Sequence, residues 1–279
     1  MFNEEIPYEE YEVENSKSTK ENLWKTSFGL QQVDGLKPSK YLVHLSQQEI
    51  EGKISYSEVR EELNRYYSES STNKETEEAD MSSVRIAEWL SQPRPFEIST
   101  RRLKQIHAHL FSDVSSFNFP VGKFRTVNIE KEEPILNGAS VFYELWNMID
   151  TALTIDFDEE MSKNYKAMNE QNKAYSAMSF ISNVWQIHPF REGNTRTMAV
   201  FAIDYFRELG FDIDNTLFEK HSLYFRNALV RDNCLKEWQT DEYINAFTDN
   251  LLLGGQHDLE AKDLSINSLE IDDDFDLEM

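Results

Sequence analysis

The residues of this sequence that could do chemistry are concentrated in one short stretch, WQIHPFREGNTRT. His188 titrates near neutral pH and is suited to act as a general base. Glu192 offers a hard oxygen ligand for a Mg²⁺ ion shared with phosphates. Gly193 lets the backbone approach a phosphate, and Asn194 and Arg196 add side-chain donors. These residue types at this spacing predict phosphoryl or nucleotidyl transfer.

Two helices are expected to hold this stretch in place. The segment 170–187 carries an apolar stripe, and the helix should end at His188, because Pro189 has no N–H group and disfavours helical geometry in the residue before it. The segment 195–209 is apolar almost all round and is predicted to be the central helix. The loop between them therefore leads into a helix N-terminus, where free N–H groups and the helix dipole favour an anion.

The sequence from His188 to Arg196, HPFREGNTR, resembles the signature loop of the Fic family of protein adenylyltransferases. That loop reads His-x-Phe-x-Asp/Glu-Gly-Asn-Gly-Arg-x-x-Arg, and six of its eight fixed positions are present in this chain. The resemblance covers most of residues 80–253. It includes LKQIHAHLF at 103–111, which is similar to a helix of the family, and GKFRTVNI at 122–129, which is similar to its target-positioning flap.

The resemblance implies transfer of AMP from ATP to a Ser, Thr or Tyr hydroxyl of a target protein. His188 would be the general base, Glu192 would hold Mg²⁺, and Phe190 would pack in the core. The expected nucleotide-binding residues are Gly193, Asn194, Thr195 and Arg196. The flap, at about 124–136, would hold the target segment by backbone pairing.

Two positions depart from the family pattern. Thr195 stands in place of a glycine, and Ala199 stands in place of the second arginine, which the family associates with the γ-phosphate of ATP and with an inhibitory glutamate. Two alternatives therefore stay open: a Fic enzyme that uses a different nucleotide or phosphate donor, and an inactive Fic-like binding module. His107 and His109 lie away from the loop in sequence and are interpreted as structural or exposed residues.

A second unit is predicted at residues 21–67, where capping signals and apolar spacing indicate three short helices. It resembles a Fic antitoxin fused to the enzyme, with Leu30 where the inhibitory helix has Ser or Thr and Asp34 where it has Glu. Because Ala199 offers no cation, inhibition would come from sterics or from Asp34 meeting Arg196. We expect such intramolecular control to be partial, and the alternative is that 21–67 is a packing module.

The predicted fold is mainly α. It consists of a Fic-type helical domain with one small β-hairpin, the flap, within residues 117–136, and a small N-terminal helical module. Helical segments of the domain are expected at 139–153, 170–187, 195–209 and 240–253. The predicted organisation is a disordered acidic tail at 1–20, the module at 21–67, a linker at 68–78, the catalytic domain at 79–253 and a disordered acidic tail at 254–279.

Charge and composition limit the partners. The net charge is −23; residues 1–24 hold seven acids and two bases, and residues 258–279 hold nine acids and one base. So much negative charge disfavours direct binding of nucleic acid. Cys234 is the only cysteine, which rules out an internal disulfide and argues against a cysteine metal site. The apolar runs are too short for a membrane span and the N-terminus lacks a signal region, so a cytoplasmic location without a membrane partner is expected.

Overall fold

The computed structural model describes residues 15–69, 74–92, 94–213 and 215–266. All regular elements in these residues are helices. The α-helices are α1 (Lys17–Gln31), α2 (Lys40–Ile50), α3 (Tyr56–Glu69), α4 (Lys74–Ser91), α5 (Thr100–Phe111), α6 (Ile149–Ser162), α7 (Glu170–Ile187), α8 (Asn194–Glu208), α9 (Thr216–Asp232) and α10 (Glu242–Leu252). Short 3₁₀ turns are η1 (Gln32–Asp34), η2 (Pro134–Leu136), η3 (Trp146–Met148), η4 (Tyr165–Ala167) and η5 (Ala261–Leu264).

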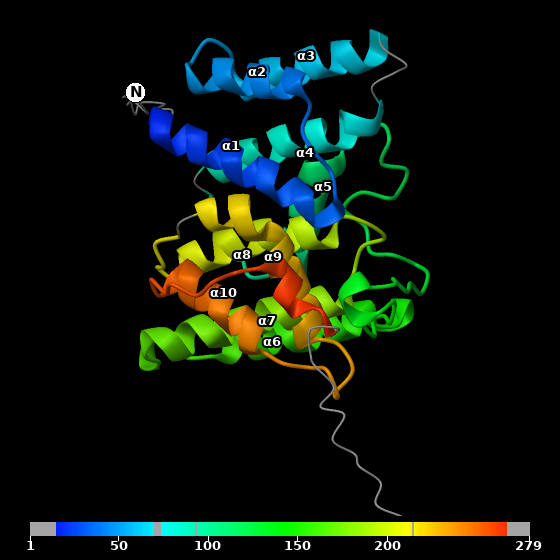
Figure 1. Ribbon diagram of the computed structural model, residues 1–279, viewed down its shortest axis with the longest axis vertical. Helices are drawn as coiled ribbons and strands as arrows, with labels where there is room; N and C mark the ends of the chain where they lie inside the picture. The colour runs from blue at the N-terminus through cyan, green and yellow to red at the C-terminus, as the bar shows by residue number, and fades with distance from the viewer. Residues whose placement is uncertain (1–14, 70–73, 93, 214, 267–279) are drawn as a thin grey trace, which may run out of the picture.

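The helix α8 lies in the middle of the fold, as its apolar composition predicts. Nearly every residue from Asn194 to Phe206 is buried. α8 packs against α5 on one side and α7 on the other, and α7 in turn contacts α6, α9 and α10. Figure 1 shows the resulting layers, with α2 and α3 at the top, α1 and α4 beneath them, then α8 and α9, and α7 and α6 at the bottom. The loop between α7 and α8 is thus held at both ends by core helices.

The N-terminal helix α1 is part of this common core. It packs against α4 and α9, and Leu23, Trp24 and Leu30 are buried. Gly29 lies directly on the backbone of α9, since a Cβ atom at this position would collide with the backbone of residues 218–219. The hydroxyl of Ser222 donates to the Gly29 carbonyl at 2.6 Å. The segment 21–67 is therefore joined to the rest of the chain through α1, whereas α2 and α3 lie on the outside (Figure 1).

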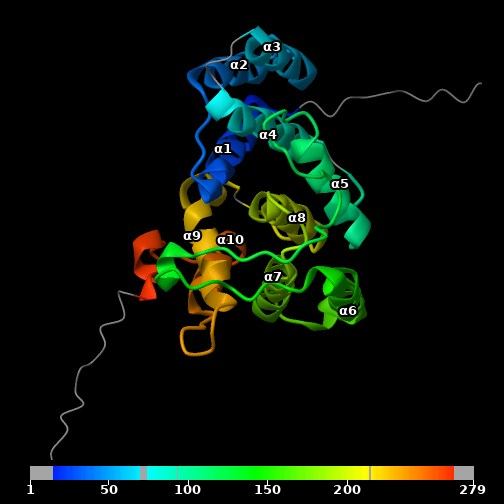
Figure 2. The same cartoon turned by 90° about the vertical axis from the view of Figure 1, so that its right-hand side faces the viewer.

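The expected β-hairpin is not formed. No strand occurs in the described residues, and the chain between α5 and α6 runs as two extended arms joined at η2 (Figure 2). Beside η2 a backbone hydrogen bond connects the arms, from the Glu133 N–H to the Ala139 carbonyl at 3.0 Å. Farther along, side chains connect them: the Lys131 N–H donates to Ser140 Oγ at 3.2 Å, and the Trp146 N–H donates to Asn128 Oδ1 at 3.0 Å. The alternation of β-favouring residues indicated extended chain correctly, but it could not show that the N–H groups would find side-chain partners.

Other boundaries also differ from the expectation. Residues 139–148 are extended or 3₁₀, so the helix predicted at 139–153 begins only at Ile149. α9 was not predicted at all. α1 begins at Lys17, inside the predicted tail 1–20, and α4 begins at Lys74, inside the predicted linker 68–78. Within the predicted tail 254–279, residues up to 266 are described and include η5, with Leu259 and Leu264 buried. The rest of that tail, 267–279, and residues 1–14 lie outside the described residues.

Three helices lie close to their predicted bounds, including the two that flank the motif. Those expected at 170–187, 195–209 and 240–253 correspond to α7, α8 and α10. Within the part of the chain that the structure describes, none of the helices combines the length and the apolar character needed to cross a membrane.

Candidate active site

His188 sits at the end of α7 in a left-handed conformation, with φ 52° and ψ 58°. A non-glycine residue rarely adopts this conformation, and here it ends the helix as Pro189 requires. The backbone N–H of His188 donates to the Trp185 carbonyl at 3.0 Å. The turn therefore directs the imidazole away from the helix axis and toward the flap arms.

The tautomer of His188 follows from its hydrogen bond. Its Nδ1 lies 3.3 Å from the Trp185 carbonyl oxygen, which can only accept, so Nδ1 carries the proton and Nε2 is left as the acceptor. The ring stacks on Tyr143 with centroids 4.1 Å apart. Burial lowers the pKa of His188 to about 3. The imidazole is therefore neutral at pH 7, and its Nε2 carries no proton.

The loop after His188 is held by its own side chains. Asn194 Oδ1 accepts the Phe190 N–H at 2.9 Å, and Asn194 Nδ2 donates to the Phe190 carbonyl at 2.9 Å. Gly193 has φ 75°, and a Cβ atom there would lie 2.5 Å from the ring of Phe111. The side chain of Asn194 is thus used to shape the loop, and Gly193 is required both by its conformation and by the close approach of α5.

His107 on α5 supports the same loop, and it is buried, in agreement with its interpretation as a structural residue. Its Nδ1 accepts the Gly122 N–H at 2.9 Å, so its Nε2 carries the proton and donates to the Glu192 carbonyl at 3.0 Å. The ring also stacks on Phe190, with centroids 3.9 Å apart. Burial lowers the pKa of His107 to about 4, which keeps this tautomer neutral. His107 therefore links the motif loop to the start of the flap, a contact that the sequence did not indicate.

His188 and Glu192 line one open pocket of about 550 Å³. The other lining residues come from the flap arms and the motif loop: Phe119, Asn128, Ile129, Glu130, Lys131, Tyr143 and Arg191. Lys131 and Arg191 are exposed, so the pocket has two cations at its rim. A base, the two carboxylates of Glu130 and Glu192, and two cations around one opening suit a phosphate ester that exchanges one of its oxygen substituents.

Glu192 is the residue of this pocket that could hold a metal. Its Oε1 accepts the Gly193 N–H at 3.1 Å, and the side chain is only partly buried. The described residues contain no group of three or more His, Cys, Asp or Glu side chains placed to hold an ion. A Mg²⁺ ion commonly binds through one or two carboxylates and takes its remaining ligands from phosphates and water, and Glu192 fits that pattern.

Arg196 is not at the pocket wall in this arrangement. It is fully buried, with its Nε 2.9 Å from Asp34 Oδ2 and its Nη2 2.5 Å from Glu78 Oε1. Its Nη1 donates to Gln31 Oε1 at 3.1 Å. Burial disfavours the charge of Arg196, but Asp34 and Glu78 together outweigh it and raise its pKa. The guanidinium is thus bonded to side chains of α1, η1 and α4.

Thr195 and Ala199, the two departures from the family pattern, are both buried in α8. Thr195 Oγ1 accepts the indole N–H of Trp185 at 3.0 Å, which ties α8 to the end of α7. A glycine at 195 would leave that buried indole N–H without this partner. The threonine therefore has a clear packing role between the two helices that carry the motif.

The flap arms are fixed to the motif loop by an arginine. The Arg125 N–H donates to the Pro189 carbonyl at 2.8 Å, and its Nε donates to the His188 carbonyl at 2.8 Å. Its guanidinium also donates to the carbonyls of Val127 and Glu144, one in each arm. One side chain therefore holds both arms beside His188, which explains how an irregular segment keeps a defined position.

A buried ion pair fixes the far end of the arms. Glu133 is fully buried and lies 2.5 Å from Arg226 on α9. The Tyr143 hydroxyl donates to Glu133 Oε1 at 3.4 Å, and burial raises the pKa of this tyrosine above its ordinary value. Because Tyr143 stacks on His188, the contacts run from α9 through Glu133 and Tyr143 to the candidate base. Nothing in the sequence pattern indicated the roles of Glu133 and Tyr143.

The comparisons with known proteins bear on this loop directly. Residues 97–206 match the Fic/DOC family. The matched residues include α5, the flap arms, α7 and almost all of α8, and hence every predicted site residue. The match to this family therefore lies in the part of the chain that forms the candidate site.

Curated relatives of this Fic/DOC region are distant. A probable protein adenylyltransferase, y4lH of Sinorhizobium fredii, is 28% identical over 130 residues, which are 46% of this chain and 62% of that protein. The protein adenylyltransferase VbhT of Bartonella schoenbuchensis is 25% identical over 154 residues, 53% of this chain and 30% of that protein. The matched stretches thus span less than two thirds of these relatives.

Solved Fic domains share the fold. The N-terminal Fic domain of Bep8 from Bartonella sp. 1-1C has a TM-score of 0.52 at 18% identity, covering 66% of this chain and 86% of that one. The type IV secretion effector BepA has a TM-score of 0.51 at 17% identity, covering 63% of this chain and 60% of that one. At these identities the likeness concerns the fold alone.

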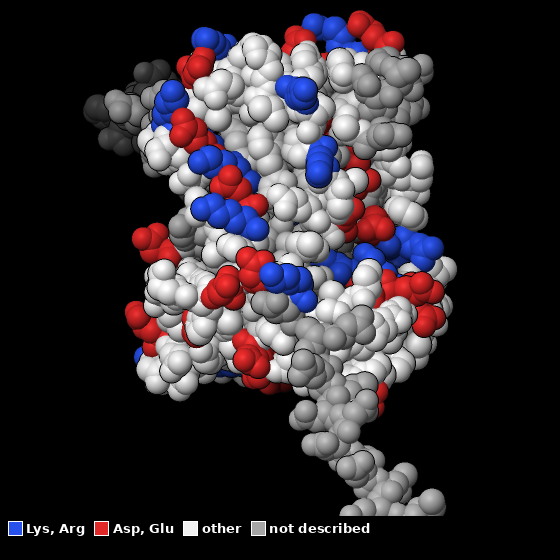
Figure 3. All heavy atoms as spheres, viewed as in Figure 1, with Lys and Arg blue, Asp and Glu red and all other residues white. Residues whose placement is uncertain are grey.

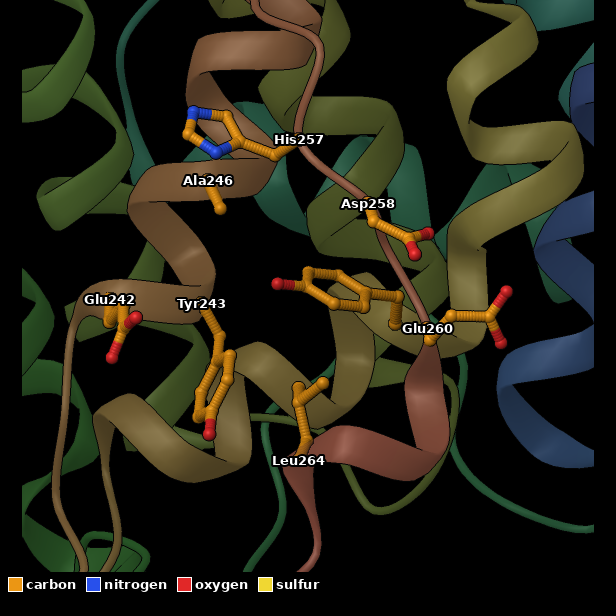
Figure 4. A pocket seen from close by; sticks show the side chains of 8 residues that line it. Glu242, Tyr243, Ala246, His257, Asp258, Glu260 and Leu264 are labelled. Atoms are coloured by element: carbon orange, nitrogen blue, oxygen red, sulfur yellow. The ribbon is translucent and has the colours of Figure 1, made fainter.

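A second pocket, of about 180 Å³, lies outside the Fic/DOC region among α9, α10 and η5. Figure 4 shows Glu242, Asp258 and Glu260 around it, with Tyr243 and Leu264 on its walls. None of the predicted site residues lines this pocket. It is therefore separate from the pocket that contains His188.

Proposed function

We propose that this chain transfers AMP from ATP to the hydroxyl of a Ser, Thr or Tyr residue of a target protein. The observation that carries the proposal is that His188 and Glu192 line one open pocket with Lys131 and Arg191 at its rim. The Fic/DOC match covers the same loop, and the curated relatives are named as protein adenylyltransferases or probable ones.

In the proposed reaction, Nε2 of His188 takes the proton of the target hydroxyl. The hydroxyl oxygen then forms a bond to the α-phosphorus of ATP, and the bond between that phosphorus and the bridging oxygen to the β-phosphate breaks. Pyrophosphate leaves with the electron pair of the broken bond. The neutral tautomer of His188 supports this role, and phosphate charge beside the ring would raise its pKa toward the working pH and make it a better base.

The remaining pocket groups would neutralise the phosphates. Glu192 would hold a Mg²⁺ ion, which when bound supplies charge neutralisation for the phosphate oxygens. Lys131 and Arg191 would contact the same phosphates from the rim, while Gly193, Asn194 and Thr195 would present the N-terminus of α8. Arg196 would reach a phosphate only after leaving its buried carboxylates.

The flap arms would hold the target segment. No backbone-to-backbone hydrogen bond of the described residues involves positions 126–132. Residues 128–131 of this stretch line the pocket that contains His188. Side chains already bond the Lys131 N–H and the Val127 carbonyl, and an extended segment could pair with the other backbone groups and bring its hydroxyl to the base.

Residues 21–67 would restrain the enzyme. Asp34 lies 2.9 Å from Arg196. This is the ion pair through which inhibition was expected if it did not come from sterics. In this proposal the module, together with Glu78 of α4, competes with the nucleotide for the guanidinium. Because Ala199 supplies no second cation, the restraint acts on Arg196 alone and leaves His188 and Glu192 at the pocket, which makes it partial.

The experiment that tests the proposal is a nucleotide panel. The full chain is incubated with Mg²⁺ and a bacterial protein lysate, with ATP, GTP, CTP or UTP added in turn, and modified peptides are identified by mass spectrometry. AMP on a Ser, Thr or Tyr residue in the ATP sample alone is the expected result. A different nucleotide adduct would establish the alternative donor, and no adduct from any nucleotide would favour the inactive binding module.

A further inference from the structure

Large apolar side chains are exposed along one stretch of chain between the flap and the middle of α6. Five of them, which we call the α6 edge, are Phe142 (72% exposed), Leu145 (53%), Trp146 (45%), Met148 (41%) and Ile155 (59%). They make up half of the ten exposed large hydrophobic side chains in the described residues. Single exposed apolar residues are ordinary, but such a concentration marks an interaction surface, and aromatic and Met side chains are typical of one.

The α6 edge begins at the rim of the candidate active site. Phe142 is adjacent to Tyr143, which lines the pocket and stacks on His188. Trp146 is joined through its backbone N–H to Asn128, another residue of the pocket. Met148 directly precedes α6, and Ile155, two turns further on, continues the surface onto that helix. A protein bound to this edge would therefore also reach the pocket.

The charge around the α6 edge is negative. Burial raises the pKa of Asp156, and the nearby carboxylates of Glu159 and Glu144 raise it further. Lys163 acts in the opposite direction, but its Nζ is paired with Glu160 at 2.7 Å. The surface thus combines apolar side chains with carboxylates that repel one another, and it is complementary to a partner with basic side chains.

Charge also argues against other occupants. The chain's own ends, residues 1–14 and 267–279, each contain six acids and no base. A second copy of the chain would bring the same carboxylates to the contact, and an anionic membrane would be repelled by them. A basic protein segment is the occupant that the charge of this surface favours.

We propose that the α6 edge is the docking surface for the protein that receives the nucleotide, and that it takes a segment with basic and large apolar side chains next to the target hydroxyl. This inference rests on the proposed transfer to a protein hydroxyl. It adds the chemistry of the partner: the pocket acts on the hydroxyl, and the α6 edge selects the segment around it.

The test uses a fluorescein-labelled synthetic peptide of alternating Lys and Leu residues with one central Thr, and binding to the full chain is followed by fluorescence anisotropy. The double variant Trp146→Ser/Ile155→Ser should bind at least about tenfold more weakly, because burying one large apolar side chain is worth roughly that factor. The matched control is Val43→Ser/Leu223→Ser, at two side chains that are 49% and 42% exposed on other helices. Equal loss of peptide binding in both double variants would overturn the proposal. So would equally strong binding of the chain to a Glu–Leu peptide, or stronger binding of the chain to phosphatidylglycerol vesicles than to the Lys–Leu peptide.

Transfer of AMP to the peptide's Thr separates this proposal from the proposed function. If the surface variant loses binding and the wild type shows no transfer, the docking surface stands and the proposed chemistry fails. Equal transfer by wild type and the Trp146→Ser/Ile155→Ser variant would leave the chemistry in place and overturn the docking surface.

Discussion

The Nε atom of Arg196 lies 2.9 Å from Oδ2 of Asp34, which connects the loop that carries the candidate active site to the N-terminal helices. Arg196 is fully buried, and Glu78 of α4 pairs with it on the other side at 2.5 Å. A buried guanidinium needs such partners, because an unpaired charge in the interior is strongly destabilising. The same two carboxylates keep the arginine from any phosphate at the pocket.

The two carboxylates should act as a unit. Asp34→Ala alone is expected to lower the free energy of unfolding by about 1 kcal/mol, because Glu78 still compensates the charge, whereas Asp34→Ala/Glu78→Ala should cost about 3–5 kcal/mol. Urea unfolding of the two single variants and the double variant measures this. Additive losses would show that the carboxylates do not share Arg196.

The same single change should affect nucleotide binding. With one competitor removed, Asp34→Ala is expected to bind ATP with Mg²⁺ about fivefold more tightly, which corresponds to about 1 kcal/mol. Calorimetry on the wild type, Asp34→Ala and the exposed-acid control Asp212→Ala gives the comparison. Weaker binding by Asp34→Ala, or an equal gain in Asp212→Ala, would contradict the restraint.

Adding a side chain at Gly193 should lower the stability of the chain more than adding one at Gly35, a glycine of similar backbone conformation. Gly193 and Gly35 have φ values of 75° and 70°, but a Cβ atom meets the Phe111 ring only at Gly193, and nothing lies within 4 Å at Gly35. Gly35→Ala is expected to cost about 1 kcal/mol of stability from the left-handed backbone, and Gly193→Ala about 2–4 kcal/mol because of the added overlap. Equal losses in urea unfolding would place Phe111 further from the loop than the structure does.

The buried histidine under the loop predicts a pH dependence of stability. The pKa of His107 is about 4 in the folded chain, below the ordinary value of 6.5, so acid favours protonation of the unfolded chain. The contribution of the neutral His107 to the free energy of unfolding is fully present above pH 6.5 and is lost as the pH falls toward 4. Between pH 7 and 4.5 the wild type should lose about 2–3 kcal/mol more than His107→Gln, which keeps a donor and an acceptor but does not titrate.

Chemical unfolding at several pH values tests this, with the exposed His44 replaced by glutamine as the control. The His44→Gln protein should follow the wild type. If His107→Gln showed the same acid dependence as the wild type, His107 would not be a neutral buried link to Glu192.

The sequence allowed the motif and its two helices to be predicted because local signals determine them. Asn169 caps α7 by accepting the Asn172 N–H at 2.7 Å. At the other end the helix stops at Ile187, two residues before Pro189. Asn194 and Gly193 shape the loop within a few residues of each other. Local propensity and the motif therefore agreed on this part of the fold.

What the sequence did not show depends on contacts between distant segments. α9 escaped prediction because buried polar side chains such as Arg226 and Arg231 interrupt its apolar pattern, and His221 has a non-helical φ of −126° inside it. The contact of His107 with Glu192 joins α5 to the motif loop, 85 positions away in sequence, and the flap arms are held by Arg125 instead of a ladder. No periodicity in the chain encodes such tertiary partners.

We propose that His188 activates a protein hydroxyl for attack on the α-phosphorus of ATP. This is tested by following radiolabel from ATP into protein in a bacterial lysate with Mg²⁺, using ATP labelled on the α-phosphate or on the γ-phosphate. We expect label in protein from the α-position alone. His188→Ala should lower the rate by about 10²–10⁴-fold, and His44→Ala should leave it unchanged. Label from the γ-position, or undiminished transfer by a folded His188→Ala protein, would show that His188 does not have this role.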